Sequence, residues 1–130
     1  MRVAIITGGR DQSPTAADRD ALLVALKAHD VTHVLHGACK GVDMWAHEVV
    51  KAAGIWVMPM PALWDAHGRA AGPKRNVAMA DVATWMTDAK AWEPARPPLC
   101  IAFPGGVETK NMTDVAKSAC FELVEIGGLP

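Results

Sequence analysis

Residues 32–54 read THVLHGACKGVDMWAHEVVKAAG, a sequence in which a strand, a glycine loop and a helix follow one another directly. The apolar and β-branched start, residues 32–36, is typical of a buried strand. Along residues 42–53 apolar side chains recur at helical spacing, at Val42, Trp45, Ala46, Val49 and Val50. Gly54 then stands where a residue in the left-handed conformation ends a helix. This order predicts a βα unit of a parallel sheet.

The same alternation continues on both sides of this unit. We expect strands at residues 2–6, 32–36, 55–58, 99–103 and 122–126, and helices at 14–28, 42–53, 73–86 and 109–120. Ser13 should cap the first helix, with Pro14 in its first turn. Residues 60–71 and 87–98 show no periodicity and are expected to be irregular. Because crossovers between parallel strands are right-handed, the predicted fold is α/β, a Rossmann-like three-layer sandwich with a mainly parallel five-stranded sheet.

Length, composition and net charge limit the classes of protein to which this chain can belong. A length of 130 residues with 51% hydrophobic and 21% charged side chains predicts one globular domain, residues 1–130. Thirteen Lys and Arg against fourteen Asp and Glu leave a net charge of -1, which argues against a protein that binds duplex DNA through phosphates. No apolar run approaches the ~20 residues that cross a bilayer, so we expect no membrane partner and a cytoplasmic protein.

The cysteines and histidines do not predict a metal site or a disulfide framework. Cys39, Cys100 and Cys120 are an odd number without CxxC spacing. The five histidines lie on different predicted elements without HExxH-like spacing, so no metal and no cofactor is expected. Cys39 lies near a helix start with His36 three residues before it, but no third group is evident that would orient a nucleophilic pair.

Three glycine turns each lead from a predicted strand into a helix. They are TGGRD at residues 7–11, HGACKGVD at 36–43 and FPGGVET at 103–109. Glycine allows the backbone to approach a ligand closely, and a helix start adds partial positive charge, so each turn can hold an anion. None matches GxGxxG or GxxxxGK[ST], which argues against an ordinary dinucleotide site and a P-loop ATPase. Taken singly, such a turn is usually only a tight βα connection, and it is the presence of all three that favours a ligand.

A fourth helix start carries two cations, Lys74 and Arg75, followed by Asn76. Cations are unfavourable at the positive end of a helix dipole unless an anion offsets them, and arginine can bind phosphate through two donors. This is the best single candidate for an anion site. Trp64 lies in the preceding irregular segment, where its ring is suited to stack on a base or to line a subunit contact. Trp45 and Trp56 are expected in the core.

Four motifs in order carry a family resemblance: ITGGRD at residues 6–11, VLHGACKGVD at 34–43, AGPKRNVAM at 71–79 and IAFPGG at 101–106. They resemble the SLOG superfamily of Rossmann-like nucleotide-binding proteins, and within it the small bacterial and phage family of unknown function related to YspA and YpsA. The resemblance covers about Val3 to Val124. It implies a nucleotide-like ligand. If the protein is phage-encoded, it also implies that the protein is located in the host cytoplasm.

The superfamily also includes the LOG phosphoribohydrolases and Smf, which binds single-stranded DNA. Arg75 matches an arginine of the LOG enzymes, and Pro104, Gly105, Gly106 and Thr109 match part of their PGGxGTxEE motif. Glu108 stands where the last motif glycine belongs, and Asn111 and Met112 stand in place of the two glutamates. A glycosidic hydrolase needs a carboxyl group at the scissile bond. Glu108 could supply it from a shifted position, and Asp43 or Asp11 could also reach the cleft, although Asp43 is as well suited to cap a helix.

The main hypothesis is a sensor or sequestering protein that binds a nucleotide or nucleotide-derived ligand at the carboxyl edge of the sheet. The candidate binding residues are Gly8, Gly9, Arg10, Gly37, Lys40, Gly41, Asp43, Trp64, Arg75, Asn76, Gly105, Gly106 and Thr109. The alternative is an N-glycosidic phosphoribohydrolase that acts on a nucleoside 5'-monophosphate, with Arg75 on the phosphate and Glu108 as acid or base. Single-stranded DNA is disfavoured by the neutral charge and the few aromatic residues. Pairing of the last helix in a homodimer or higher oligomer, and its burial against the sheet, explain its apolar residues equally well.

Overall fold

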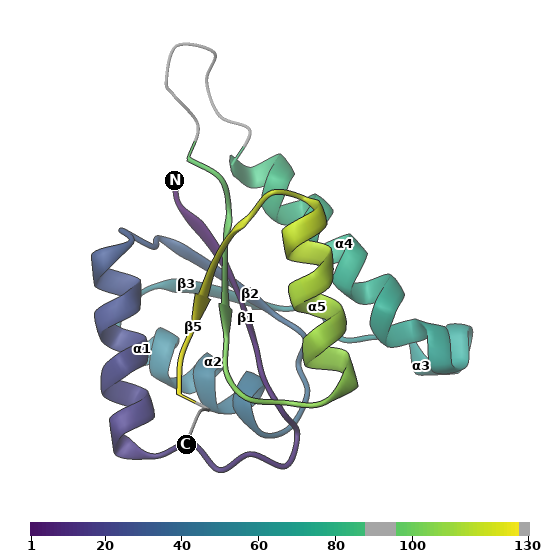
Figure 1. The fold of residues 1–130 in the computed structure, drawn as a ribbon, viewed down its shortest axis with the longest axis horizontal. Helices are drawn as coiled ribbons and strands as arrows, with labels where there is room; N and C mark the ends of the chain where they lie inside the picture. Colours follow the sequence, from purple (N-terminus) through teal and green to yellow (C-terminus); the bar gives the residue numbers. More distant parts are fainter. Residues whose placement is uncertain (88–95, 128–130) are drawn as a thin grey trace.

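The computed structural model describes residues 1–87 and 96–127 and has a five-stranded, all-parallel sheet (Figure 1). The strands are β1 (Val3–Thr7), β2 (His33–His36), β3 (Trp56–Pro59), β4 (Leu99–Ala102) and β5 (Glu122–Glu125). The helices are α1 (Ala16–Ala28), α2 (Val42–Ala52), α3 (Trp64–His67), the short 3-10 helix η1 (Gly68–Ala70), α4 (Ala71–Thr87) and α5 (Val107–Ser118). The predicted Rossmann-like α/β architecture is confirmed.

The strand order β3-β2-β1-β4-β5 places β1 at the centre of the sheet. β1 pairs with β2 on one side and with β4 on the other, so Ile5 lies between Leu35 and Cys100. The chain proceeds outward from β1 in one direction and from β4 in the other. The carboxyl ends of these two strands therefore form a topological switch point, where open α/β sheets bind their ligands.

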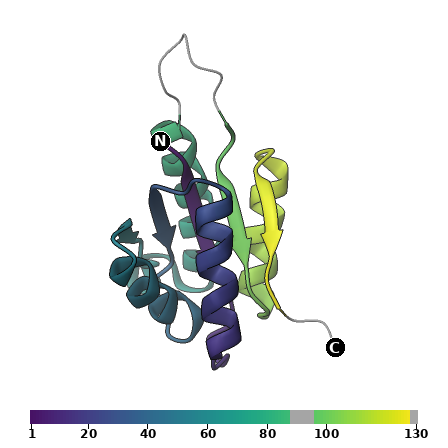
Figure 2. The ribbon, with the colours of Figure 1, turned by 90° about the vertical axis from the view of Figure 1, so that its left-hand side faces the viewer.

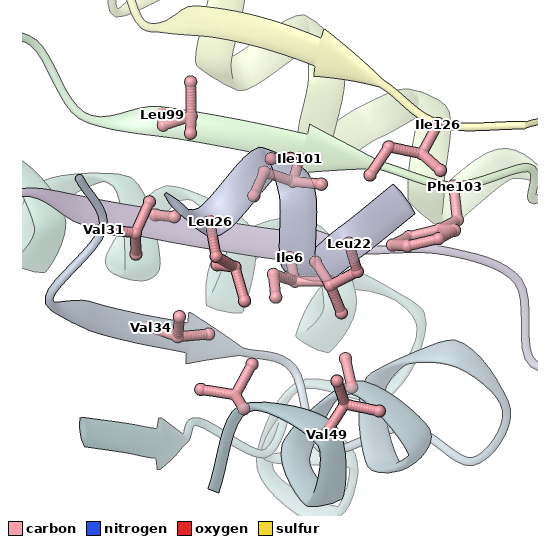
Figure 3. Close-up of a cluster of buried hydrophobic side chains, with 14 of the residues drawn as sticks. Ile6, Leu22, Leu26, Val31, Val34, Val49, Leu99, Ile101, Phe103 and Ile126 are labelled. Atoms are coloured by element: carbon pink, nitrogen blue, oxygen red, sulfur yellow. The ribbon is translucent and has the colours of Figure 1, made fainter. Parts of the chain in front are cut away.

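Helices cover both faces of the sheet, and the two faces have separate cores. On one face α1 and α2 enclose Ile6, Leu22, Val34 and Ile101 (Figure 3). On the other face α4 and α5 pack over the sheet. The apolar residues that they contribute to this second core are Met79, Ala80, Ala83, Met112 and Ala116. Figure 2 shows α1 in front of the sheet with α4 and α5 behind it. Successive residues of β1 alternate between these cores because side chains of a strand point to opposite faces.

Three of the four predicted helix starts, those of α1, α4 and α5, differ from the structure by two residues, and α2 begins at residue 42 as predicted. Thr15, and not Ser13, caps α1: its hydroxyl accepts the backbone N–H of Asp18, whose carboxylate accepts the N–H of Thr15. The prediction of Pro14 in the first turn was therefore wrong, because Pro14 precedes the cap. Helix α4 begins at Ala71, since Pro73 still falls among the first four positions, where a missing N–H costs no hydrogen bond. Gly54 has the predicted left-handed φ of 76°.

Residues 60–71, expected to be irregular, contain α3 and η1. No side chain of either is buried, so the segment carries no apolar periodicity that would reveal its helical turns. Trp56 was wrongly expected in the core: it lies on the edge strand β3, is 46% exposed and packs on His33 with ring centroids 5.3 Å apart. Most of the predicted 87–98 connection, with Trp92, lies outside the described residues. Within the described ranges no helix is long and apolar enough to span a bilayer.

Candidate functional site

A cavity of about 360 Å³ lies at the switch point between β1 and β4. Residues after β1, β2 and β4 line it, together with α4 residues and the first turn of α5. Ten predicted site residues are among its walls: Gly8, Gly9, Arg10, Gly37, Asp43, Arg75, Asn76, Gly106, Glu108 and Thr109. Segments up to about 100 residues apart in sequence therefore meet at one place, as the convergence of strand ends in a parallel sheet requires.

Arg75 reaches the cavity from the second turn of α4 and is 8% exposed. Its Nη1 atom donates to the carbonyl oxygens of Gly37, at 2.5 Å, and Met60, at 3.3 Å, while its Nε atom donates to Oδ1 of Asn76 at 2.9 Å. Gly37 permits this approach, because a Cβ there would lie 2.5 Å from Nη1. The contacts fix the plane of the guanidinium and leave Nη2, which has the Cys39 sulfur 3.9 Å away, for a ligand.

Within the described part of the chain, no carboxylate lies within 4 Å of the Arg75 guanidinium. A buried cation without a paired anion is costly, and a bound phosphate would supply the missing charge. The neighbouring acidic group is Asp43 on α2, which burial holds at a pKa of about 6 while Arg75 acts in the opposite direction. Asp43 is therefore largely ionised at neutral pH and takes up its proton as the pH falls through about 6.

Asp43 uses one carboxylate oxygen for the loop and leaves the other unpaired. Its Oδ2 atom accepts the backbone N–H of Cys39 at 3.2 Å. Its Oδ1 atom is buried and has no hydrogen-bond partner among the described residues. The predicted capping role is wrong in its detail, since Gly41 occupies the cap position of α2 and no side chain caps that helix. Oδ1 is thus an unsatisfied acceptor in the buried wall of the cavity.

Asn76 was predicted to bind the ligand, and its amide is engaged by the protein. Its Oδ1 atom accepts from Arg75, and its Nδ2 atom donates to Oδ1 of Asn111 at 2.9 Å and to the Glu108 carbonyl at 3.4 Å. At 2% exposure it joins α4 to the start of α5. In this structure Asn76 positions Arg75 and α5, and its amide has little remaining capacity for a ligand.

Arg10 and Glu108 meet at the mouth of the cavity. The Arg10 Nη2 atom lies 3.3 and 3.5 Å from the two carboxylate oxygens of Glu108 and 3.9 Å from the Cys39 sulfur. Glu108 first, and Cys39 second, raise the pKa of Arg10. The guanidinium carbon also lies 5.5 Å from the centroid of the Trp64 ring, within the range of a cation–π contact. Trp64 thus contacts a wall residue of the cavity from α3.

The glycine loops use several of their N–H groups internally. The N–H of Gly9 donates to the Pro104 carbonyl, that of Ala38 to His36 Nδ1 and that of Cys39 to Asp43. The start of α5 differs, because Gly106 caps it without a side-chain hydrogen bond and lines the cavity. The first N–H groups of α5 therefore have no partner within the helix, and this helix start lines the cavity together with Arg75.

His36 does not serve as a base for Cys39. The imidazole is fully buried, with Nδ1 accepting the Ala38 N–H at 3.0 Å and Nε2 lying 2.8 Å from Nδ1 of His47. This arrangement fits a neutral ring that donates through Nε2. Burial, and then the charges of His47 and Arg75, lower its pKa to about 4. Both ring nitrogens are occupied, so His36 shapes the loop after β2.

Four predicted residues lie outside the cavity walls: Lys40, Gly41, Trp64 and Gly105. Lys40 is exposed and 4.0 Å from Asp11. Gly41, with φ of 81°, packs against the backbone carbonyl of Gly9, and Gly105 packs against Thr109. Sequence reasoning did not single out four wall residues, Ile6, Thr7, Met79 and Val107. Ile6 and Met79 are apolar and were expected in the core, and Thr7 and Val107 belong to the quoted glycine turns but were not chosen as binding residues.

No protein-family model, curated protein or solved structure matches this chain. The fold and the site define an α/β domain with a buried arginine at its switch-point cavity. The resemblance to the SLOG superfamily stays a prediction.

Proposed function

We propose that the protein binds a nucleotide or nucleotide-derived ligand in the switch-point cavity, and that it works as a sensor or sequestering protein. The observation that carries the proposal is the buried Arg75 guanidinium, which faces the cavity without a carboxylate partner in the described ranges. Its position beside the uncapped start of α5 supports a phosphate or similar anion as the group it binds.

The remaining walls favour an ester over free phosphate. A volume of about 360 Å³ exceeds the need of a single anion and lies in the range of small-molecule sites. Ile6 and Met79 contribute apolar surface, and Asp43 contributes a carboxylate, a group that accepts hydrogen bonds from hydroxyl and amino groups. These features support a ligand that combines an anion, hydrogen-bond donors and a ring.

The phosphoribohydrolase alternative depends on Glu108, the wall carboxylate that occupies the shifted motif position. Both of its oxygens lie within 3.5 Å of Arg10, so neither is free to protonate a leaving group unless that contact opens. A glycosidase also uses a second carboxyl or an activated water on the opposite face of the sugar. Asp43 and the exposed Asp11 are the other wall carboxylates that could fill this role. The engaged Glu108 favours binding over turnover.

The test is to incubate the purified protein with nucleoside monophosphates, NAD, ADP-ribose and cyclic nucleotides and to follow each by mass spectrometry. A binder depletes one free compound, and heat denaturation returns it intact. A hydrolase accumulates free base and phosphoribose. If every compound stays free and unchanged, the proposal is contradicted.

The Glu108→Gln variant separates the two functions once a ligand is found. The amide keeps the size of the side chain but cannot exchange a proton as a carboxyl group does. Turnover that disappears in this variant, with the ligand still bound, supports the hydrolase. An affinity within a few fold of the parent, with no product from either protein, supports a binder.

A further inference from the structure

Cys39 occupies a position between two arginine side chains at the wall of the cavity. Its sulfur lies 3.9 Å from Nη2 of Arg10 and 3.9 Å from Nη2 of Arg75. These two guanidiniums come from the loop after β1 and from α4, so the fold and not the local sequence creates the arrangement. Two cationic donors therefore face one sulfur.

The cavity is a built site independently of the cysteine. Asp43 is 5% exposed and lines the same cavity, yet its Oδ1 atom has no hydrogen-bond partner among the described residues. Arg75 lines it as well, and its Nη2 atom faces the sulfur. Cys39 lines this cavity too, so a small molecule that enters it comes close to the sulfur.

The three cysteines of the chain differ in their surroundings. Cys39 is half-buried on the cavity wall, Cys100 is fully buried in β4, and Cys120 is exposed after α5. Burial raises the pKa of the Cys100 thiol to about 12, which leaves it unreactive. Exposure alone would make Cys120 the first to react. Charge predicts the opposite order, because no described arginine or lysine donates a hydrogen bond to Cys120 as Arg10 and Arg75 do to Cys39.

We propose that Cys39 is a modification site, at which the sulfur reacts with small electrophiles and hydroperoxides in preference to the other two cysteines. With a hydroperoxide, the sulfur attacks the terminal oxygen and an S–O bond forms while the O–O bond breaks. The thiol proton goes to the departing alkoxide, so the products are a sulfenic acid and an alcohol. With iodoacetamide, an S–C bond forms, iodide leaves and the thiol proton goes to solvent.

Arg10 and Glu108 provide two variants with opposite expected effects on the rate at which Cys39 reacts. Glu108 shares the Arg10 guanidinium with the sulfur, at 3.3 Å from Nη2. Arg10→Gln removes one cation from the sulfur, whereas Glu108→Gln removes the competing anion and leaves Arg10 to the sulfur. Lys40→Gln is the matched control: it removes an equal charge from the adjacent residue, whose side chain is 77% exposed and directed to Asp11.

The experiment treats the folded full-length protein with limiting iodoacetamide and, separately, with tert-butyl hydroperoxide plus dimedone to trap sulfenic acid. Each cysteine lies on a different tryptic peptide, so mass spectrometry gives three rates from one sample. We expect Cys39 to react about fivefold or more faster than Cys120, as a nearby cation in a partly screened site would produce. Arg10→Gln should slow Cys39, Glu108→Gln should accelerate it, and Lys40→Gln should leave it unchanged.

Two results would overturn the proposal. One is a Cys39 rate at or below that of Cys120 in both treatments. The other is a Cys39 rate that Arg10→Gln and Glu108→Gln shift in the same direction, which would indicate a change of access and not of charge. Urea unfolding of each variant, compared with the parent, verifies that the rates refer to folded protein. None of these rates requires a nucleotide, so the proposal stands or fails separately from the proposed function.

Discussion

The Nη1 atom of Arg75 lies 2.5 Å from the carbonyl oxygen of Gly37, across 38 positions of sequence. This contact joins α4 to the loop after β2 and decides where the positive charge of the cavity lies. It also explains why the loop needs glycine, since a Cβ at position 37 would lie 2.5 Å from the same nitrogen.

Gly37→Ala should displace the Arg75 guanidinium and weaken anion binding more than tenfold, because the new methyl group occupies the space of Nη1. It should also destabilise the fold by about 1–3 kcal/mol. Gly54→Ala is the control. Its φ of 76° strains an alanine, but nothing lies within 4 Å of the added Cβ, and Gly54 does not line the cavity. Calorimetric titration should show lost affinity in the first variant and unchanged affinity in the second. Equal affinities in both would contradict the role of the Gly37 contact.

His36 and Asp43 should act on stability in opposite directions between about pH 4 and 6.5. The folded pKa of His36 is lowered to about 4, so its contribution is present above pH 6.5 and is lost as the pH falls toward 4. The folded pKa of Asp43 is raised to about 6, so its contribution is present below pH 3.8 and is lost as the pH rises through 6. The two contributions offset one another.

Asp43→Asn removes one side of this balance. Between pH 4.5 and 6.5, the free energy of unfolding of this variant should rise more steeply than that of the parent. The two changes should differ by up to about 2 kcal/mol. Urea unfolding at the two pH values measures the difference. Parallel profiles of variant and parent would show that Asp43 does not titrate in this range.

Glu122→Gln should destabilise the protein by about 1–3 kcal/mol, because it leaves the Arg2 guanidinium buried without its charge partner. Arg2 is 4% exposed, and its Nη2 atom lies 2.6 Å from the Glu122 carboxylate. Glu125→Gln, on the same strand and without an ion pair among residues 1–87 and 96–127, should change the unfolding free energy by less than about 0.5 kcal/mol. Thermal unfolding compares the two, and equal losses would argue against the Arg2 pair.

Carbamidomethylation of Cys39 should lower affinity for the ligand, since the added group lies between Arg10 and Arg75. The comparison is protein carrying the same group on Cys120 after mutation of Cys39 to serine, which should bind as the untreated variant does. This prediction depends on the proposed function as well as on Cys39 reactivity. Retained affinity after complete modification of Cys39 would place the ligand elsewhere.

Much of the fold follows from local patterns. Short apolar runs closed by glycine turns predicted all five strands, and the βα alternation predicted the two-sided sheet. The sequence failed at α3, whose side chains are all exposed, and at Trp56, because an edge strand and a central strand have the same apolar composition. Periodicity reports burial on one element and not the position of that element in a sheet.

The site was predictable where backbone chemistry decides it and less so where side chains cross between elements. Arg75 was predicted as a cation at a helix start, but α4 begins at Ala71 and places it in the second turn. The glycine turns follow from the ends of parallel strands. The engagement of Asn76 with Asn111, and the position of Cys39 between Arg10 and Arg75, depend on how α4 packs on the loops. No spacing in the sequence reports those contacts.

The most direct test of the central claim is a calorimetric titration of Arg75→Lys with the nucleotide that the parent binds in the mass-spectrometric panel. Lysine keeps the charge but cannot reproduce the contacts of a guanidinium that donates to Gly37, Met60 and Asn76 at once. We predict a loss of affinity of at least about tenfold, with the exposed neighbour variant Lys74→Gln unchanged. An Arg75→Lys protein that is folded and binds as tightly as the parent would contradict the claim that this arginine holds the ligand.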